Sequence, residues 1–243
     1  KCLVTGGRCG IGRELVRTLV GTGQKVTLTS RYPHIADIGS LSDGDFEDPA
    51  LVPRFTPKIL PLDLRNLSSL KAMEKVILAE RFNVLILSAA ETLIYPESLT
   101  EITKEEAEER VDWTHDVKRV NTGLWHKTLD KHSNEEIFSP LQVNIGGCSV
   151  LLRAFLKMVL QARKEGDESL YCALVVTSFE GAFYPKQPYH PMTNASKAGI
   201  EQVVWTLQRQ AEVLDCTIVC VDPGWIYTDT TEAKKKGPLR IEY

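Results

Sequence analysis

The chain has 243 residues, of which 43% are hydrophobic and 25% are charged, as expected for one α/β domain with a sizeable core. With 16 glycines and 12 prolines, its composition excludes collagen-like and low-complexity proteins. The net charge of −3 gives no sign of a nucleic-acid or membrane-surface partner. Apolar runs such as Val84–Ala90 are far too short to form a transmembrane segment.

Apolar strand patterns alternate with helical periodicity along the chain. This alternation predicts a Rossmann-type, doubly wound parallel sheet in a three-layer α/β/α domain that comprises residues 1–243. A first helix is expected from about Ile11 until Gly21 and Gly23 stop it. The other expected helices are Leu67–Ala79, Gln142–Gln161 and Ala195–Leu214, and the expected strands are Cys2–Val4, Lys25–Thr29, Lys58–Leu62, Asn83–Ser88, Leu170–Thr177 and Thr217–Val221.

Two segments interrupt this alternation. Pro33–Pro57 has the Gly/Asp/Pro-rich composition of a loop. Residues of about 94–140 form a charged, partly helical insertion that contains Trp113 and Trp125. One interpretation is a solvated helix with a few aromatic side chains in the core, and the other is a docking surface for a protein partner.

The turn after the first strand is rich in glycine. Glycines there permit a tight turn and a close approach of the backbone to a pyrophosphate, and the following helix offers N–H groups and a positive dipole. A Gly-rich turn without a ligand is the alternative. The candidate dinucleotide-binding residues of this turn are Thr5, Gly6, Arg8, Cys9, Gly10, Ile11 and Gly12.

Arg31 follows the second predicted strand, where a dinucleotide would place its adenosine ribose. An acidic residue there would suit the free 2′-hydroxyl of NAD, whereas an arginine suits the 2′-phosphate of NADP. Arg8 adds a second positive charge nearby. The sequence therefore favours NADP over NAD as the cofactor if the chain binds a dinucleotide at all.

The six cysteines are scattered without CxxC pairs and are interpreted as reduced thiols. This indicates an intracellular, reducing compartment, either the cytoplasm or an organelle matrix, because a chain that starts at Lys1 is compatible with a missing targeting segment. The five histidines show no metal-ligand spacing, so no metal site is predicted.

These motifs resemble, in order and over almost the whole chain, those of the short-chain dehydrogenases/reductases (SDRs). The Gly-rich turn is similar to the family motif TGxxxGIG, and Ser88-Ala89-Ala90 stands where the family has NAG. The resemblance implies cofactor contacts by Asp63 and Leu64 at the adenine ring, and by Pro223, Gly224, Ile226 and Thr228 at the nicotinamide. It also implies an active site at Asn144, Ser178, Thr193 and Lys197, in which Lys197 additionally holds the cofactor ribose.

The catalytic tyrosine of the family motif YxxxK is replaced by Thr193, four residues before Lys197. In the family, the lysine lowers the pKa of the phenol, which starts near ~10 and exchanges a proton with the substrate. An aliphatic hydroxyl is a far weaker acid because no ring delocalises its anion. Tyr184 or Tyr189 could replace the lost phenol, although Pro188 and Pro191 indicate that Tyr189 lies in a loop.

The C-terminal region is shorter than is usual for the resembled family, since only Asp229–Tyr243 follow Thr228. This predicts an exposed sheet edge that invites a partner. The family commonly dimerises through two long helices, which correspond here to Gln142–Gln161 and Ala195–Leu214.

Three functions fit the sequence. The favoured one is a catalytically impaired or inactive SDR-like protein that serves as an interaction or structural subunit, with NADP still bound or with no dinucleotide. The second is an active NADP-dependent oxidoreductase that acts on a carbonyl or alcohol through a displaced tyrosine, or through Ser178 and a water. The third is an NADPH-sensing regulatory module.

Overall fold

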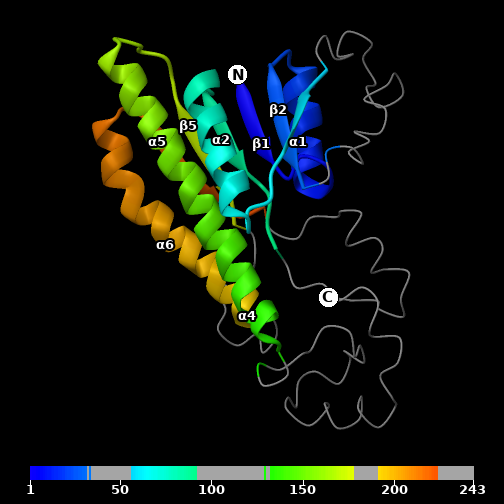
Figure 1. The fold of residues 1–243 in the computed structure, drawn as a ribbon. Helices are drawn as coiled ribbons and strands as arrows, with labels where there is room; N and C mark the ends of the chain where they lie inside the picture. The colour runs from blue at the N-terminus through cyan, green and yellow to red at the C-terminus, as the bar shows by residue number, and fades with distance from the viewer. Residues whose placement is uncertain (32, 34–55, 92–128, 130–131, 178–190, 224–243) are drawn as a thin grey trace, which may run out of the picture.

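The computed structural model describes residues 1–31, 33, 56–91, 129, 132–177 and 191–223 (Figure 1). Six strands form one sheet in the order β3-β2-β1-β4-β5-β6, and every neighbouring pair is parallel. This confirms the predicted doubly wound parallel sheet. The strands are β1 (Cys2–Thr5), β2 (Val26–Ser30), β3 (Lys58–Pro61), β4 (Val84–Leu87), β5 (Cys172–Val176) and β6 (Thr217–Val221).

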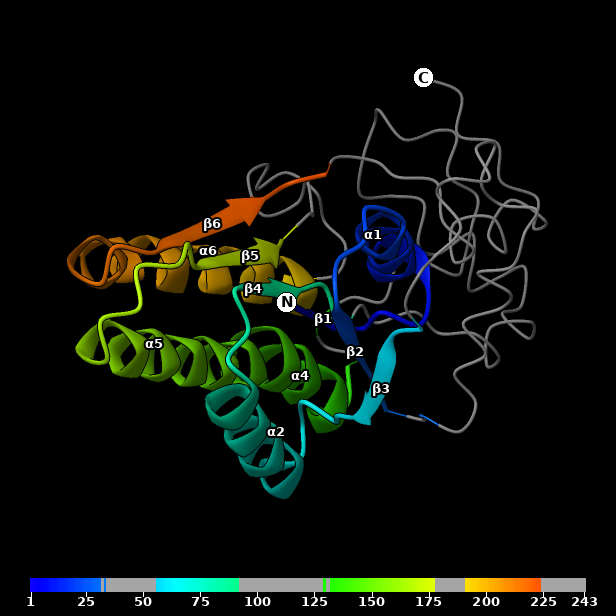
Figure 2. The ribbon, with the colours of Figure 1, turned by 90° about the horizontal axis from the view of Figure 1, so that it is seen from above.

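Helices cover both faces of the sheet. Figure 2 shows α1 on one face, over β1 and β2, and the long helices on the opposite face. The three-layer α/β/α arrangement is thereby confirmed. The helices are α1 (Gly10–Gly21), α2 (Leu67–Glu80), α4 (Asn134–Pro140), the π-helical segment η5 (Leu141–Gly147), α5 (Cys148–Lys164) and α6 (Pro191–Val213).

The apolar core is divided by the sheet. The smaller part packs Val16 and Val20 of α1 against Val4 and Leu28 of the sheet. The larger part lies between the sheet and α2, α5 and α6, where side chains such as Phe155 are completely buried. The strands therefore carry apolar side chains on both faces, as expected for a parallel sheet covered on both sides.

The helix that precedes β5 begins earlier than the sequence predicted. We expected it to start at Gln142, but α4, η5 and α5 form one continuous helix from Asn134. Ser133 and Glu136 form a capping box, in which Ser133 Oγ accepts from the Glu136 N–H and Glu136 Oε2 accepts from the Ser133 N–H. Pro140 lies inside this helix, directly before the π-helical segment.

This continuous helix, Asn134–Lys164, is long and apolar enough to cross a bilayer by length and composition. Most of its most apolar stretch is buried inside the structure, where Leu151, Leu152 and Phe155 belong to the core. Its apolar character is therefore explained by packing against the sheet.

One arginine joins the elements at the end of the domain where α5 and α6 terminate. Arg163 donates hydrogen bonds of 2.6–3.0 Å to four backbone carbonyls, and its guanidinium lies 5.3 Å from the centre of the Tyr171 ring. This side chain thus ties the ends of both helices to the segments that enter β5 and β6. The four carbonyls belong to Asp167, Ser169, Leu214 and Asp215.

We expect Arg163→Ala to lower the free energy of unfolding by about 2 kcal/mol, because several charge-assisted hydrogen bonds are lost at once. Urea denaturation followed by circular dichroism measures this. Arg209→Ala is the matched control, since Arg209 is exposed on α6 and, among the residues that the structure describes, pairs only with Glu212. Its loss should cost less than about 0.5 kcal/mol. Equal destabilisation by the two substitutions would contradict the role given to Arg163.

Candidate functional site

The predicted site residues gather at the carboxyl edge of the sheet. The direction in which the strands are added reverses between β1 and β4. The chain continues from β1 to β2 on one side, and from β4 to β5 on the other side of the sheet. Ligands of open α/β sheets bind outside the carboxyl ends of the strands at such a switch point. Thr5 ends β1 there, and Ser88 directly follows β4.

The Gly-rich turn brings backbone into direct contact with backbone. Gly6 has a φ of +66°, and a Cβ on it would lie 2.8 Å from the Ala89 Cα. A Cβ on Gly12 would overlap the carbonyl oxygen of Gly6, so α1 packs directly on the turn. Gly6 is therefore required for both conformation and space, and Gly12 is required for space alone.

The first turn of α1 offers backbone N–H groups. Cys9 is the N-cap, but its side chain caps none of them, and the first turn holds no acidic residue. Arg8 is exposed beside this turn. The cradle therefore fits a pyrophosphate, which would accept from these N–H groups and benefit from the helix dipole.

Thr5 joins the ends of β1 and β4. Its buried Oγ1 accepts hydrogen bonds of 3.1 Å from the N–H groups of both Ser88 and Ala89. Ala90 is exposed at the same edge. The Ser-Ala-Ala segment thus keeps a fixed position against the Gly-rich turn, although its sequence departs from the family's NAG.

The ends of β2 and β3 place charged groups together. The Leu62 N–H donates to the Ser30 carbonyl, and the exposed Arg31 and half-exposed Asp63 follow directly. Burial tends to raise the pKa of the Asp63 carboxyl, but hydrogen bonds and charge from Arg65, with the charge of Arg31, bring it below its ordinary value. Leu64 is buried in the core, where it packs against Gly147.

Asn144 lies in the π-helical segment and uses its whole amide. Its Oδ1 accepts from the Glu91 N–H at 2.8 Å, and its Nδ2 donates to the Glu91 carbonyl and to Ser196 Oγ, both at 2.9 Å. Ser196 Oγ in turn donates to the Thr193 carbonyl at 2.7 Å. Asn144 therefore connects the chain after β4 to the first turns of α6.

Thr193 and Lys197 lie on consecutive turns of α6, and both are buried. Thr193 Oγ1 has no hydrogen-bond partner within the part of the chain that is described. Lys197 Nζ donates to the Val176 carbonyl over a long 3.4 Å. The Lys197 amine is thus held at the end of β5, on the helical turn that follows Thr193.

Burial lowers the pKa of Lys197 below its ordinary value, and neighbouring groups offset this only in part. Burial is also the main reason why the pKa of the thiols rises, to about 11 for Cys148 and about 12 for Cys220. Both thiols are protonated at neutral pH. The groups that favour the charged form of Lys197 are Cys148, Glu201 and Cys220.

Several predicted residues cannot be placed. Pro223 is half-buried after β6, but Gly224, Ile226 and Thr228 lie outside the described residues, as does Ser178. The same holds for Tyr184 and Tyr189 and for most of the charged insertion. Among the described residues, no group of three or more His, Cys, Asp or Glu side chains is placed to hold a metal ion.

Comparisons with known proteins were made for sequence and structure. No protein-family model matches the chain. An uncharacterized protein of Acanthamoeba polyphaga mimivirus is 26% identical over 280 residues, which cover 98% of this chain and 58% of the relative. The chain therefore spans less than two thirds of that curated relative's length.

Solved structures agree far better in fold than in sequence. A short-chain dehydrogenase from Sphingobium yanoikuyae in complex with NADPH has a TM-score of 0.65 at 15% identity, covering 94% of this chain and 72% of its own. One from Burkholderia cenocepacia in complex with NADP has a TM-score of 0.63 at 16% identity, with coverages of 98% and 76%. The chain has the short-chain dehydrogenase/reductase fold. A third such enzyme, from Streptomyces avermitilis, has a TM-score of 0.61 at 20% identity, with coverages of 94% and 67%.

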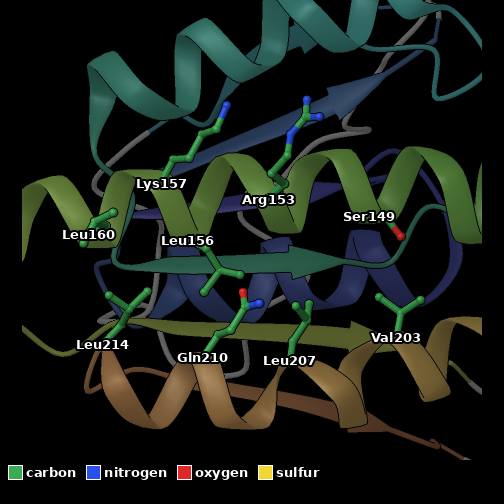
Figure 3. A pocket seen from close by; sticks show the side chains of 9 residues that line it. All are labelled: Ser149, Arg153, Leu156, Lys157, Leu160, Val203, Leu207, Gln210 and Leu214. Carbon is green, nitrogen blue, oxygen red and sulfur yellow. The ribbon is translucent and has the colours of Figure 1, made fainter.

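A groove lies away from the nucleotide end, between two of the long helices. This groove of about 340 Å³ lies between α5 and α6, and Figure 3 shows Leu156 and Leu160 facing Leu207 and Leu214 across it. None of the predicted site residues lines it. The groove thus lies on the helix pair through which, by the family resemblance, a dimer would form, apart from the nucleotide end.

Sequence reasoning missed three residues of the site. Arg65 binds Asp63, Ser196 links Asn144 to α6, and Glu91 holds Asn144 through its backbone. The role of Arg65 could have been predicted from the sequence, since a basic residue two positions after a carboxylate can reach back to it across a turn. The role of Glu91 could not have been predicted, because only its main-chain atoms bind Asn144.

We expect Gly12→Ala to lower the free energy of unfolding by about 2 kcal/mol or more, because the added Cβ would push α1 away from the Gly6 carbonyl. Gly146→Ala is the matched control. Among the described residues, a Cβ on Gly146 would meet only the Leu141 carbonyl oxygen, at an ordinary 3.9 Å, so the effect of the substitution should stay within about 1 kcal/mol. Urea denaturation measures both, and equal stability of Gly12→Ala and the native chain would refute the packing argument.

Proposed function

We propose that the chain is an SDR-like protein that binds NADP(H) at the carboxyl edge of the sheet. We propose further that its proton-transfer chemistry is impaired and that it acts as an interaction or structural subunit. The observation that carries the proposal is the contrast between an intact nucleotide cradle at Gly6–Gly12 and the buried Thr193 in place of a phenol.

The chain's own groups support nucleotide binding. The N–H groups at the start of α1 suit a pyrophosphate, and Arg31 at the end of β2 suits a 2′-phosphate. Lys197, at the end of β5, has donor capacity beyond its one long hydrogen bond within the described residues. When bound, NADPH supplies a hydride to a carbonyl carbon.

The proton is the step that the site does not support. A carbonyl oxygen that receives a hydride on its carbon needs a proton from an acid. Thr193 Oγ is an aliphatic hydroxyl, and the charge of Lys197 cannot bring its pKa near neutrality. The Cys148 and Cys220 thiols hold their protons too tightly to serve. Loss of a general acid typically costs ~10²–10⁴-fold in rate.

An active NADP-dependent oxidoreductase is the second candidate. It is supported by the Lys197 amine, which lies at the end of β5, where the family resemblance implies the active site. The required tyrosine, Tyr184 or Tyr189, lies outside the described residues. The protein partner and the NADPH-sensing role also remain predictions, because they depend on the charged insertion and the chain after Pro223.

We expect the native chain to bind NADPH at least tenfold more tightly than NADH, because only NADPH carries a 2′-phosphate that Arg31 can bind. Arg31→Asp should weaken the binding of NADPH by about tenfold or more, and it should leave the affinity for NADH unchanged or higher. Isothermal titration calorimetry with both dinucleotides measures this. A native chain that binds neither one would refute the proposed nucleotide function.

We expect Thr193→Tyr to raise NADPH-dependent reduction by about 10²-fold over the native rate, because it restores a phenol one turn from Lys197. The assay is loss of NADPH absorbance over a panel of aldehydes and ketones. Thr193→Phe adds the ring without the hydroxyl and should give no gain. Ordinary enzymatic rates in the native chain, lost on Tyr184→Phe or Tyr189→Phe, would instead establish the active oxidoreductase.

A further inference from the structure

The groove between α5 and α6 is built from the same residue spacing on both helices. Its lining residues include positions at intervals of four, three and four along α5, from Ser149 to Leu160, and along α6, from Val203 to Leu214. Such heptad-like spacing keeps one face of a helix turned toward a neighbouring helix. The groove therefore has the form of a seat for a third helix.

The floor of the groove is apolar and open to solvent. Figure 3 shows Leu156 and Leu160 of α5 facing Leu207 and Leu214 of α6. Leu160 remains 42% exposed. Along α5 the groove extends from Ser149 to Leu160, a rise of ~17 Å, so it would hold about three turns of another helix.

One rim of the groove is basic. Its two charged lining residues are Arg153 and Lys157, which Figure 3 shows pointing from α5 toward α2, and no carboxylate lines it among the described residues. Both cations share the single carboxylate of Glu74 on α2, at 3.2 Å and 3.3 Å. One carboxylate leaves this group of three with a net positive charge, and the exposed Lys71 lies one turn before Glu74. The groove therefore fits a helix that has an acidic face beside an apolar one.

We propose that the α5–α6 groove binds an acidic amphipathic helix of a protein partner. The apolar face of that helix covers the leucines, and its carboxylates pair with Arg153 and Lys157. This inference deepens the interaction role in the proposed function and rests on it. It assigns that role to a surface away from the nucleotide end.

A second copy of the chain fits this surface less well. Two copies related by a two-fold axis through the groove would place α5 against its own counterpart. α5 contains no acidic residue along its whole length, and its exposed charged residues are Arg153, Lys157 and Lys164. Such a contact would oppose cations with cations, which lowers affinity, whereas an acidic helix brings the opposite charge.

The first test measures the binding of a labelled synthetic helix by fluorescence anisotropy. The probe has about 14 residues, with leucine at heptad spacing on one face and glutamate at the flanking positions. We expect the native chain to bind it at least about tenfold more tightly than a probe with lysine in place of glutamate. A scrambled probe of the same composition lacks a continuous apolar face and should also bind about tenfold more weakly. Equal binding of the three probes, or no binding of the acidic one, overturns the inference.

Substitutions in the groove test its floor and its rim separately. Leu160→Asp places a charge on the apolar floor, and Arg153→Gln removes a cation from the rim, so each should weaken the binding of the acidic probe by about fivefold or more. Leu170→Asp and Lys25→Gln are the matched controls, because both residues are exposed outside the groove. The controls should change the affinity by less than about twofold.

Glu74→Gln provides a test that misfolding cannot imitate, because the expected result is a gain. The substitution releases Arg153 and Lys157 from their present carboxylate, so the affinity for the acidic probe should rise by about threefold. An affinity that stays the same or falls, in a variant whose thermal unfolding is unchanged, would contradict the role given to the two cations.

Sedimentation velocity distinguishes a second copy from a partner. A native dimer that Leu160→Asp dissociates would mean that a second copy occupies the groove, and this result overturns the inference. A chain that binds NADPH but not the acidic probe loses this inference alone. A chain that binds the probe and reduces carbonyls at ordinary enzymatic rates keeps the groove and loses the proposed impairment of proton transfer.

Discussion

The site depends on the close approach of two backbones at the switch point between β1 and β4. Gly6 lies so near Ala89 that no side chain fits between them, and Thr5 Oγ1 binds two consecutive N–H groups after β4. Both strands then end at the same level, with the start of α1 directed at the space beyond them. A larger residue at Gly6 or Gly12 would separate these elements, so packing and ligand binding constrain the same positions.

A second set of contacts positions the chemical end. The π-helical segment lies between the chain after β3 and α6, since Gly147 packs against Leu64 and Gly199 packs against Ile145. This position turns Asn144 toward both Glu91 and Ser196, and through Ser196 it reaches the turn that carries Thr193. Asn144 thus links the chain after β4 to the first turns of α6, where the family resemblance implies the active site.

Electrostatics divide the edge into two regions. The adenosine region is polar and partly exposed, and there the pKa of Asp63 is lowered by arginines. The region around Lys197 is buried, and there desolvation lowers the pKa of the amine and raises that of two thiols. The first region suits recognition of a phosphate. The second region favours the neutral forms of its groups, since the amine binds its proton less tightly and the two thiols release theirs less readily. This contrast agrees with a protein that retains nucleotide binding and has lost efficient proton transfer.

The sequence alone determined the sheet, the order of its elements, the Gly-rich turn and the loss of the tyrosine, because each is encoded locally by periodicity or by residue type. It placed the start of the helix before β5 at Gln142, whereas the structure has this start at Asn134. A proline inside a helix, here Pro140, cannot be distinguished locally from a proline at a helix boundary. Only the tertiary structure joined Asn144 to Glu91 and Ser196 and left Thr193 Oγ1 buried without a partner in the described part of the chain. Those facts depend on which groups meet across the fold, and distances between remote segments are not written in the local pattern.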